Sequence, residues 1–269
     1  MPNNQPKLIM TTEDFVSLIL PKINRNIVDL NNIDYRVDPE QRVADSFIRV
    51  HNLASIFDIR YLYAKKLFEY QKDDYFISII DDVSSGYSLN EYPQSAVLTA
   101  TYGRGDCEDF ARLQYFMHKS FSNIDPYLVI IFFEGYDPVN RENVLFGHAF
   151  NAFVKDGSTI GIQNYGIFRY LENIPITDPG KTIVGLVKSL YPTTVFCALC
   201  KMKEWNPETK YEDRIQVIKA YEYDAVQSIP TVISYKELTV PPSVFSIDFK
   251  YLIYAVLGVL VIALIVLKL

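Results

Sequence analysis

At residues 102–113 the sequence reads YGRGDCEDFARL. Its two glycines permit backbone angles and close approaches that other residues do not. Asp106 is a typical helix N-cap, and an acidic residue three positions later, Asp109, can complete a capping box. Apolar residues then recur at helical spacing. The segment therefore predicts a tight loop that opens into a helix ending at about Lys119, with Cys107 in the first turn.

The first turn of a helix is a favourable place for a reactive cysteine. Unpaired backbone N–H groups and the positive end of the helix dipole stabilise an anion there, so a thiol at this position forms its thiolate more readily. The backbone N–H of Cys107 is also suited to stabilise an oxyanion. The neighbouring acids Asp106, Glu108 and Asp109 oppose the thiolate, so a histidine partner has to outweigh them.

One of the three histidines lies in a suitable setting. His148 belongs to the segment FGHAFNAFVKDG, which is typical of a strand followed by a turn at Asp156-Gly157. A second strand at residues 159–166 carries Asn164. An antiparallel hairpin about this turn would place His148 and Asn164 side by side.

These three residues occur in the order of a Cys–His–Asn/Asp triad. Residues 102–166 resemble the transglutaminase-like (papain-related) cysteine enzyme superfamily, in which a Gly-x-Cys-x-Asp-type motif opens the core helix. A His-Ala-aromatic strand and a third residue on the next strand follow in that family. The segments GDCEDFA and GHAF match the first two motifs, with phenylalanine where tryptophan is common. Asn164 occupies the third position, where the family more often has aspartate.

The resemblance implies a cysteine hydrolase or acyltransferase that acts on peptide or glutamine amide bonds. Cys107 would be the nucleophile, His148 the general base and then the general acid, and Asn164 the residue that orients the imidazole. The partner would be a protein or peptide substrate. The thioacyl-enzyme is resolved by water or by an amine, and the sequence does not choose between them. Because asparagine carries no charge, weaker activation of the histidine is expected than with aspartate.

An inactive protein is the alternative interpretation. The missing aspartate and the surplus acids around Cys107 also suit a structural or scaffold protein that keeps the fold without turnover, for example in a virion or envelope. A reactive thiol at Cys107 would favour the enzyme, and an inert one would favour the scaffold.

Other residues that carry functional groups have simpler interpretations. Residues 87–101 are expected to form a loop that approaches the cysteine. Gln94 in this loop is a candidate oxyanion donor, as a glutamine is in papain-like enzymes, although a solvent-exposed loop residue is the favoured interpretation. His51 and His118 are interpreted as ordinary helix residues. Three helical turns, or roughly 16 Å, separate His118 from Cys107, which makes it a poor general base.

Composition and cysteine usage exclude some classes of function. The net charge of −6 and the lack of a basic stripe argue against a nucleic-acid partner. Three cysteines without a secretory signal favour a reducing environment. Cys197 and Cys200 have the spacing of a metal or redox pair, but no second Cys/His pair accompanies them, and their segment is typical of a buried strand. No metal and no cofactor are therefore expected.

The apolar and polar patterns predict an α+β fold. A helical N-terminal part and the core helix bearing the cysteine are expected to pack on an antiparallel sheet. The predicted helices of the N-terminal part are a short one stopped by Pro21, one that begins after Asp38 and one over residues 58–70. The further expected elements are strands at residues 126–135 and 193–202, a helix at 182–190, and irregular chain at 226–246.

A hydrophobic tail completes the predicted organisation. Residues 251–267 form an uncharged apolar run between two lysines, which as a helix spans about 26 Å, at the short limit for crossing a membrane. The predicted fold therefore adds one C-terminal transmembrane helix at residues 250–268, after a transglutaminase-like domain at 1–225 and a proline-containing linker at 226–249. Such a single-pass tail anchor would bind a lipid membrane and leave the globular part on the cytoplasmic side.

Overall fold

A computed structural model of the chain describes residues 10–23, 34–71, 94–139, 141–210 and 213–241. Its main sheet has seven strands in the order β8-β7-β3-β4-β5-β6-β9. The bounds of these strands are β3 (Ile124–Asp137), β4 (Glu142–Lys155), β5 (Thr159–Asn164), β6 (Ile167–Leu171), β7 (Thr194–Met202), β8 (Ile215–Tyr221) and β9 (Lys236–Leu238). All neighbouring strands in this sheet are antiparallel, so the predicted antiparallel sheet is confirmed.

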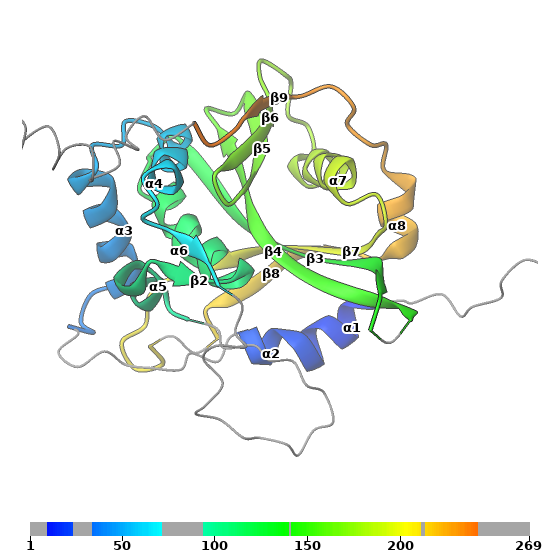
Figure 1. The fold of residues 1–269 in the computed structure, drawn as a ribbon, viewed down its shortest axis with the longest axis horizontal. Coiled ribbons are helices and arrows are strands. Elements are labelled where there is room, and N and C mark those ends of the chain that lie inside the picture. Colours follow the sequence, from blue (N-terminus) through cyan, green and yellow to red (C-terminus); the bar gives the residue numbers. More distant parts are fainter. Residues whose placement is uncertain (1–9, 24–33, 72–93, 140, 211–212, 242–269) are drawn as a thin grey trace, which may run out of the picture.

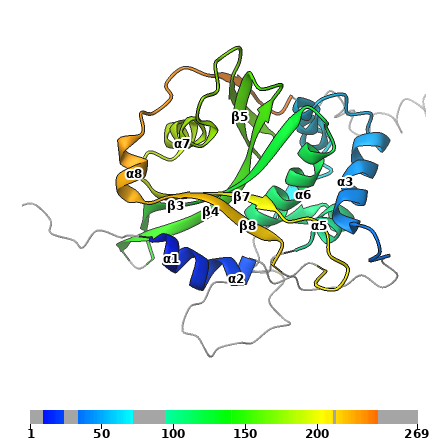
Figure 2. The same ribbon diagram turned by 180° about the vertical axis from the view of Figure 1, so that it is seen from behind.

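Helices cover both faces of the sheet. They are α1 (Thr12–Asp14), the π-helical η1 (Phe15–Ile19), α2 (Leu20–Ile23), α3 (Pro39–Val50), the 3-10 helix η2 (Ile56–Ile59), α4 (Arg60–Ala64), α5 (Ala96–Tyr102), α6 (Cys107–Lys119), α7 (Pro179–Leu190) and α8 (Tyr223–Ser228). Figures 1 and 2 show α6 with α3, α4 and α5 on one side of the sheet, and α7 with α8 on the other. A separate parallel pair, β1 (Glu69–Tyr70) and β2 (Arg104–Gly105), leads into α6.

Two apolar cores result, one on each face of the sheet. Successive side chains of a strand point to opposite faces, and β4 supplies both cores in this way. Ala149 and Phe153 pack in the core that contains α6, whereas Phe150 and Ala152 pack in the core that contains α7. The helix that carries Cys107 and the strand that carries His148 therefore contribute side chains to the same core.

The predicted transmembrane helix requires a correction to the fold class. Among the residues that the structure describes, no helix is long and apolar enough to cross a membrane. Residues 250–268, for which that helix was predicted, lie outside the described residues. The described residues therefore form an α+β fold, with the helical N-terminal part, the cysteine-bearing helix and the antiparallel sheet.

Several predicted elements differ from the observed ones. The first helix was predicted to stop at Pro21, but helical structure continues past it to Ile23, the end of α2. In a π-helix each N–H donates five residues back, and the N–H of Leu20 bonds the Phe15 carbonyl in this way. The predicted helix over residues 58–70 is shortened to η2 and α4. Residues 96–102 form α5 where a loop was expected. β9 lies within the segment 226–246 that was expected to be irregular, and α8 extends into that segment.

Candidate active site

The local structure around Cys107 follows the predicted signals. Gly103 ends α5 in the left-handed conformation with φ +64°, which glycine adopts without strain. A Cβ on Gly105 would lie 2.7 Å from the Asp109 side chain, so only glycine fits this approach. The Asp109 carboxylate in turn accepts a hydrogen bond from the N–H of Asp106 at 3.2 Å. The predicted glycine turn, cap and helix start are confirmed, and α6 begins at Cys107.

Asp109 also fixes the segment that precedes α5. Its Oδ1 accepts a hydrogen bond from the backbone N–H of Gln94 at 2.6 Å, which ties Gln94 to the first turn of α6. The expectation that Gln94 is solvent-exposed is wrong, since the residue is 1% exposed. Neither Oε1 nor Nε2 of its amide has a hydrogen-bond partner among the described residues. A buried amide in this state has unused donor capacity.

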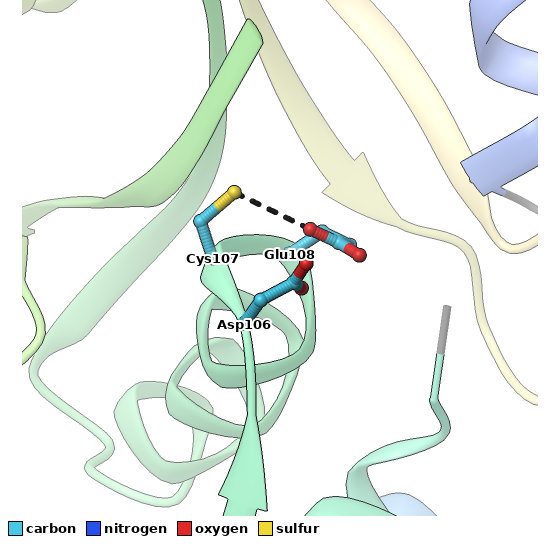
Figure 3. A group of neighbouring side chains, drawn as sticks. All are labelled: Asp106, Cys107 and Glu108. Carbon is cyan, nitrogen blue, oxygen red and sulfur yellow. Dashed lines mark hydrogen bonds between the residues drawn. The ribbon is translucent and has the colours of Figure 1, made fainter. Parts of the chain in front are cut away.

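Two acidic side chains lie near the Cys107 sulfur. Figure 3 shows Asp106, Cys107 and Glu108 together in the first turn of α6, and the Cys107 thiol donates a hydrogen bond to Glu108 Oε2 at 3.3 Å. Burial raises the pKa of Asp106. The hydrogen bond to Glu108 stabilises the protonated thiol and opposes the thiolate.

The same three side chains are close enough together to share a metal ion. Their ligand atoms lie within 4.8 Å of one another. They are consecutive residues of one helix start, so this closeness follows from their places in the chain.

His148 and Asn164 come together on the predicted hairpin. Strands β4 and β5 are antiparallel, and the turn between them has positive φ at Asp156 and Gly157, which suits a tight hairpin. The paired region ends at Asn151 and Gln163. Just beyond it, Nε2 of His148 lies 3.2 Å from Oδ1 of Asn164. The predicted side-by-side placement of the two residues is confirmed.

This contact determines which ring nitrogen of His148 carries the proton. An amide oxygen only accepts hydrogen bonds, so Nε2 of a neutral His148 carries the proton and donates to Asn164. Nδ1 then carries the lone pair. Burial lowers the pKa of His148, and the hydrogen bond to Asn164 opposes that effect. The imidazole is therefore favoured in its neutral form, which is the form a general base requires.

Two tyrosine rings lie beside His148. The rings of Tyr165 and Tyr191 have their centroids 6.3 Å and 5.4 Å from the imidazole of His148. Burial raises the pKa of both phenols, and the negative charge of a Cys107 thiolate raises it further. Cys107 thus lies within electrostatic reach of the same two rings that flank His148. Sequence reasoning missed both tyrosines, because no pattern in the sequence distinguishes them among 20 tyrosines.

The remaining histidine and cysteine candidates lie elsewhere. His118 is fully buried in α6 and contacts Gln163 on β5, as an ordinary helix residue of the core. Cys197 and Cys200 are both buried in β7, one in the core of α7 and the other in the core of α6. Because their side chains lie on opposite faces of the sheet, they do not form one redox or metal pair. The interpretation as core cysteines is confirmed.

Comparison with known proteins gives no family for this chain. No protein-family model matches the sequence, and no curated protein matches it either.

Proposed function

We propose that the protein is a cysteine hydrolase or acyltransferase of the transglutaminase-like kind, acting on peptide or glutamine amide bonds. The observation that carries this proposal is the contact between His148 Nε2 and Asn164 Oδ1 at 3.2 Å. With the proton on Nε2, Nδ1 of the neutral imidazole is free to act as the base for Cys107. Cys107 lies at the start of α6, and the charge of its thiolate would raise the pKa of Tyr165 and Tyr191, the two tyrosines beside the imidazole.

The proposed reaction uses the three triad residues and two hydrogen-bond donors. Nδ1 of His148 removes the thiol proton while Cys107 Sγ attacks the amide carbonyl carbon. The oxyanion is stabilised by the backbone N–H of Cys107, with the buried amide of Gln94 as a second donor. His148 then gives the proton to the leaving amine, and a thioacyl-enzyme results. Water or an amine releases the acyl group and restores the thiol.

A second candidate is a structural protein without turnover. The observation that favours it is the hydrogen bond from the Cys107 thiol to Glu108 at 3.3 Å, because a neighbouring carboxylate holds the sulfur in its protonated form. In that protein the triad residues would serve packing alone, and His148 would have no influence on the thiol.

The test is the rate of alkylation of Cys107 by iodoacetamide between pH 5 and 9 in the full-length protein. Burial keeps the other two thiols protonated, and it raises the pKa of Cys200 to about 12, so the native protein reports on Cys107. Cys107→Ser gives the background rate. The proposal predicts that His148→Ala slows alkylation at neutral pH by about 10²-fold, whereas His51→Ala does not. Equal rates in the wild type and His148→Ala would refute the enzyme and favour the structural protein.

A further inference from the structure

The turn between β5 and β6 contains a tyrosine with a strained backbone. Asn164 pairs with Ile167 across this turn, so Tyr165 and Gly166 are its two central residues. Tyr165 has a positive φ of 52°, and Gly166 does not. Glycine adopts this left-handed conformation without strain, whereas a bulky side chain rarely does. Among the residues that the structure describes, Tyr165 is the only aromatic residue with a positive φ.

Two buried glutamine side chains hold the backbone of Tyr165. Its carbonyl oxygen accepts hydrogen bonds from Nε2 of Gln163 at 2.6 Å and from Nε2 of Gln114 at 3.1 Å. A carbonyl oxygen only accepts, so it fixes the NH₂ end of the Gln163 amide, and the oxygen end then accepts from Nε2 of the fully buried His118. A strained backbone persists where its surroundings determine it in this way.

The ring of Tyr165 packs on both halves of the candidate site. Its centroid lies 6.3 Å from the imidazole of His148 on β4, and 6.0 Å from the ring of Phe110, which follows Cys107 by three residues in α6. Aromatic rings at these separations are in packing contact. Burial raises the pKa of the Tyr165 phenol, and among the neighbouring charges that of a Cys107 thiolate raises it most.

We infer that Tyr165 is a positioning residue, whose strained backbone holds its ring against both α6 and His148 and thereby sets the approach of the Cys107 thiol to the imidazole. A side chain that packs on both elements fixes their separation, and a displacement of about 1 Å is enough to slow a reaction about 10²-fold. This inference rests on the proposed function, because the approach matters for chemistry only where His148 is the base for Cys107.

The coupling between thiol and imidazole is the ratio of the Cys107 alkylation rates without and with His148→Ala, measured on full-length protein at pH 7.5. A ratio cancels any change in the exposure of the thiol. It should fall from about 10²-fold to about tenfold or less in Tyr165→Gly, which lacks the ring. Tyr165→Phe keeps the ring and should keep the wild-type ratio. Tyr170→Ala is the matched control and should also keep it, because it removes a buried tyrosine ring that packs on Phe57.

The backbone strain has its own measurement, which is urea unfolding of Tyr165→Gly and Tyr165→Ala. Both variants lack the ring, but only alanine keeps the Cβ that disfavours the left-handed conformation. The glycine variant should therefore have the smaller unfolding equilibrium constant, by about fivefold. An alanine variant that is as stable as the glycine variant would contradict the strain at this position.

An unchanged coupling ratio in Tyr165→Gly would overturn the inference. If His148→Ala has no effect on alkylation in the wild type, the proposed function fails, and an NMR titration of the His148 ring protons tests the placement of Tyr165 alone. Burial lowers the pKa of His148, so loss of the ring that packs on the imidazole should raise this pKa toward its usual value. The same pKa in Tyr165→Gly as in the wild type would then overturn the inference.

Discussion

At the scale of single residues, the third member of the candidate triad is the uncharged Asn164. Asn164 holds the imidazole of His148 through a neutral oxygen, and the pKa of His148 lies below its usual value because burial outweighs this hydrogen bond. A carboxylate at the same distance would favour the imidazolium. The identity of residue 164 therefore decides whether His148 is neutral or charged near neutral pH.

Asn164→Asp should raise the pKa of His148 by about 1–3 pH units, because an opposite charge within hydrogen-bond distance stabilises the protonated ring. The measurement is an NMR titration of the His148 ring protons. Asn164→Ala is the matched control and should lower the pKa further, since it removes the group that opposes the effect of burial. A lower pKa in Asn164→Asp would contradict this account of the site.

The residues of the candidate site whose positions depend on local sequence patterns were predictable from the sequence. Cys107 was predictable from the glycines and the cap, and the His148–Asn164 pair from a hairpin about one turn. Gln94 and Tyr191 were not predictable, because their burial and hydrogen bonds depend on segments that meet only in the folded chain. The hydrogen bond between Asn164 and Tyr191, for example, joins residues 27 positions apart, and no local pattern encodes it.

At the scale of elements, α6 combines the candidate nucleophile with a buried histidine. His118 lies in its last turns, fully buried against Phe153 and Phe168, and its Nε2 contacts Gln163. Burial lowers the pKa of His118 to about 4, although the contact with Gln163 opposes that effect. The helix that carries Cys107 is therefore sensitive to acid at its opposite end.

Protonation of His118 should destabilise the fold. Its pKa is about 4 in the folded protein and 6.5 in the unfolded one, so the unfolded state binds the proton first as the pH falls. Its contribution is fully present above pH 6.5 and is lost progressively down to about pH 4, with a total of about 3 kcal/mol. Urea unfolding of the wild type and His118→Gln over this range measures it. The wild type should lose more stability than the variant, and parallel pH profiles would contradict the prediction.

The elements themselves were predictable where the pattern was long and uniform. The strand β3, with its continuous apolar run, and the helix α6, with its cap, were found close to their observed bounds. The elements that were predicted wrongly are short segments such as α5 and β9, whose structure depends on contacts with distant parts of the chain. The N–H of Ala96 at the start of α5 donates to Glu40 on α3, and β9 exists because it pairs with β6.

At the scale of the whole molecule, one buried ion cluster connects the N-terminal helices with the core. Glu40, which has no exposed surface, pairs with Arg112 of α6 at 2.6 Å and with Arg214, next to β8, at 2.7 Å. Arg214 also pairs with Asp38 at 2.8 Å. The Glu40 pairs join residues 72 and 174 positions apart, which is why the sequence alone did not predict them.

Glu40→Gln should destabilise the whole protein by about 3–5 kcal/mol, because it removes the buried carboxylate that pairs with Arg112 and leaves Arg214 paired with Asp38 alone. Burial alone would raise the pKa of Glu40, but the two arginines outweigh it and hold the pKa below its usual value. The stabilisation is therefore present at neutral pH and is lost only as the pH falls through that lowered pKa.

Urea unfolding at pH 7 measures the loss of stability in Glu40→Gln. The control Glu237→Gln, in a more exposed pair with Arg169, should change stability by less than about 1 kcal/mol. If the two variants were equally stable, the cluster would not hold the N-terminal helices to the core.

If the cluster does hold them, Glu40→Gln should also alter alkylation of Cys107, because Glu40 fixes the start of α5 beside Gln94.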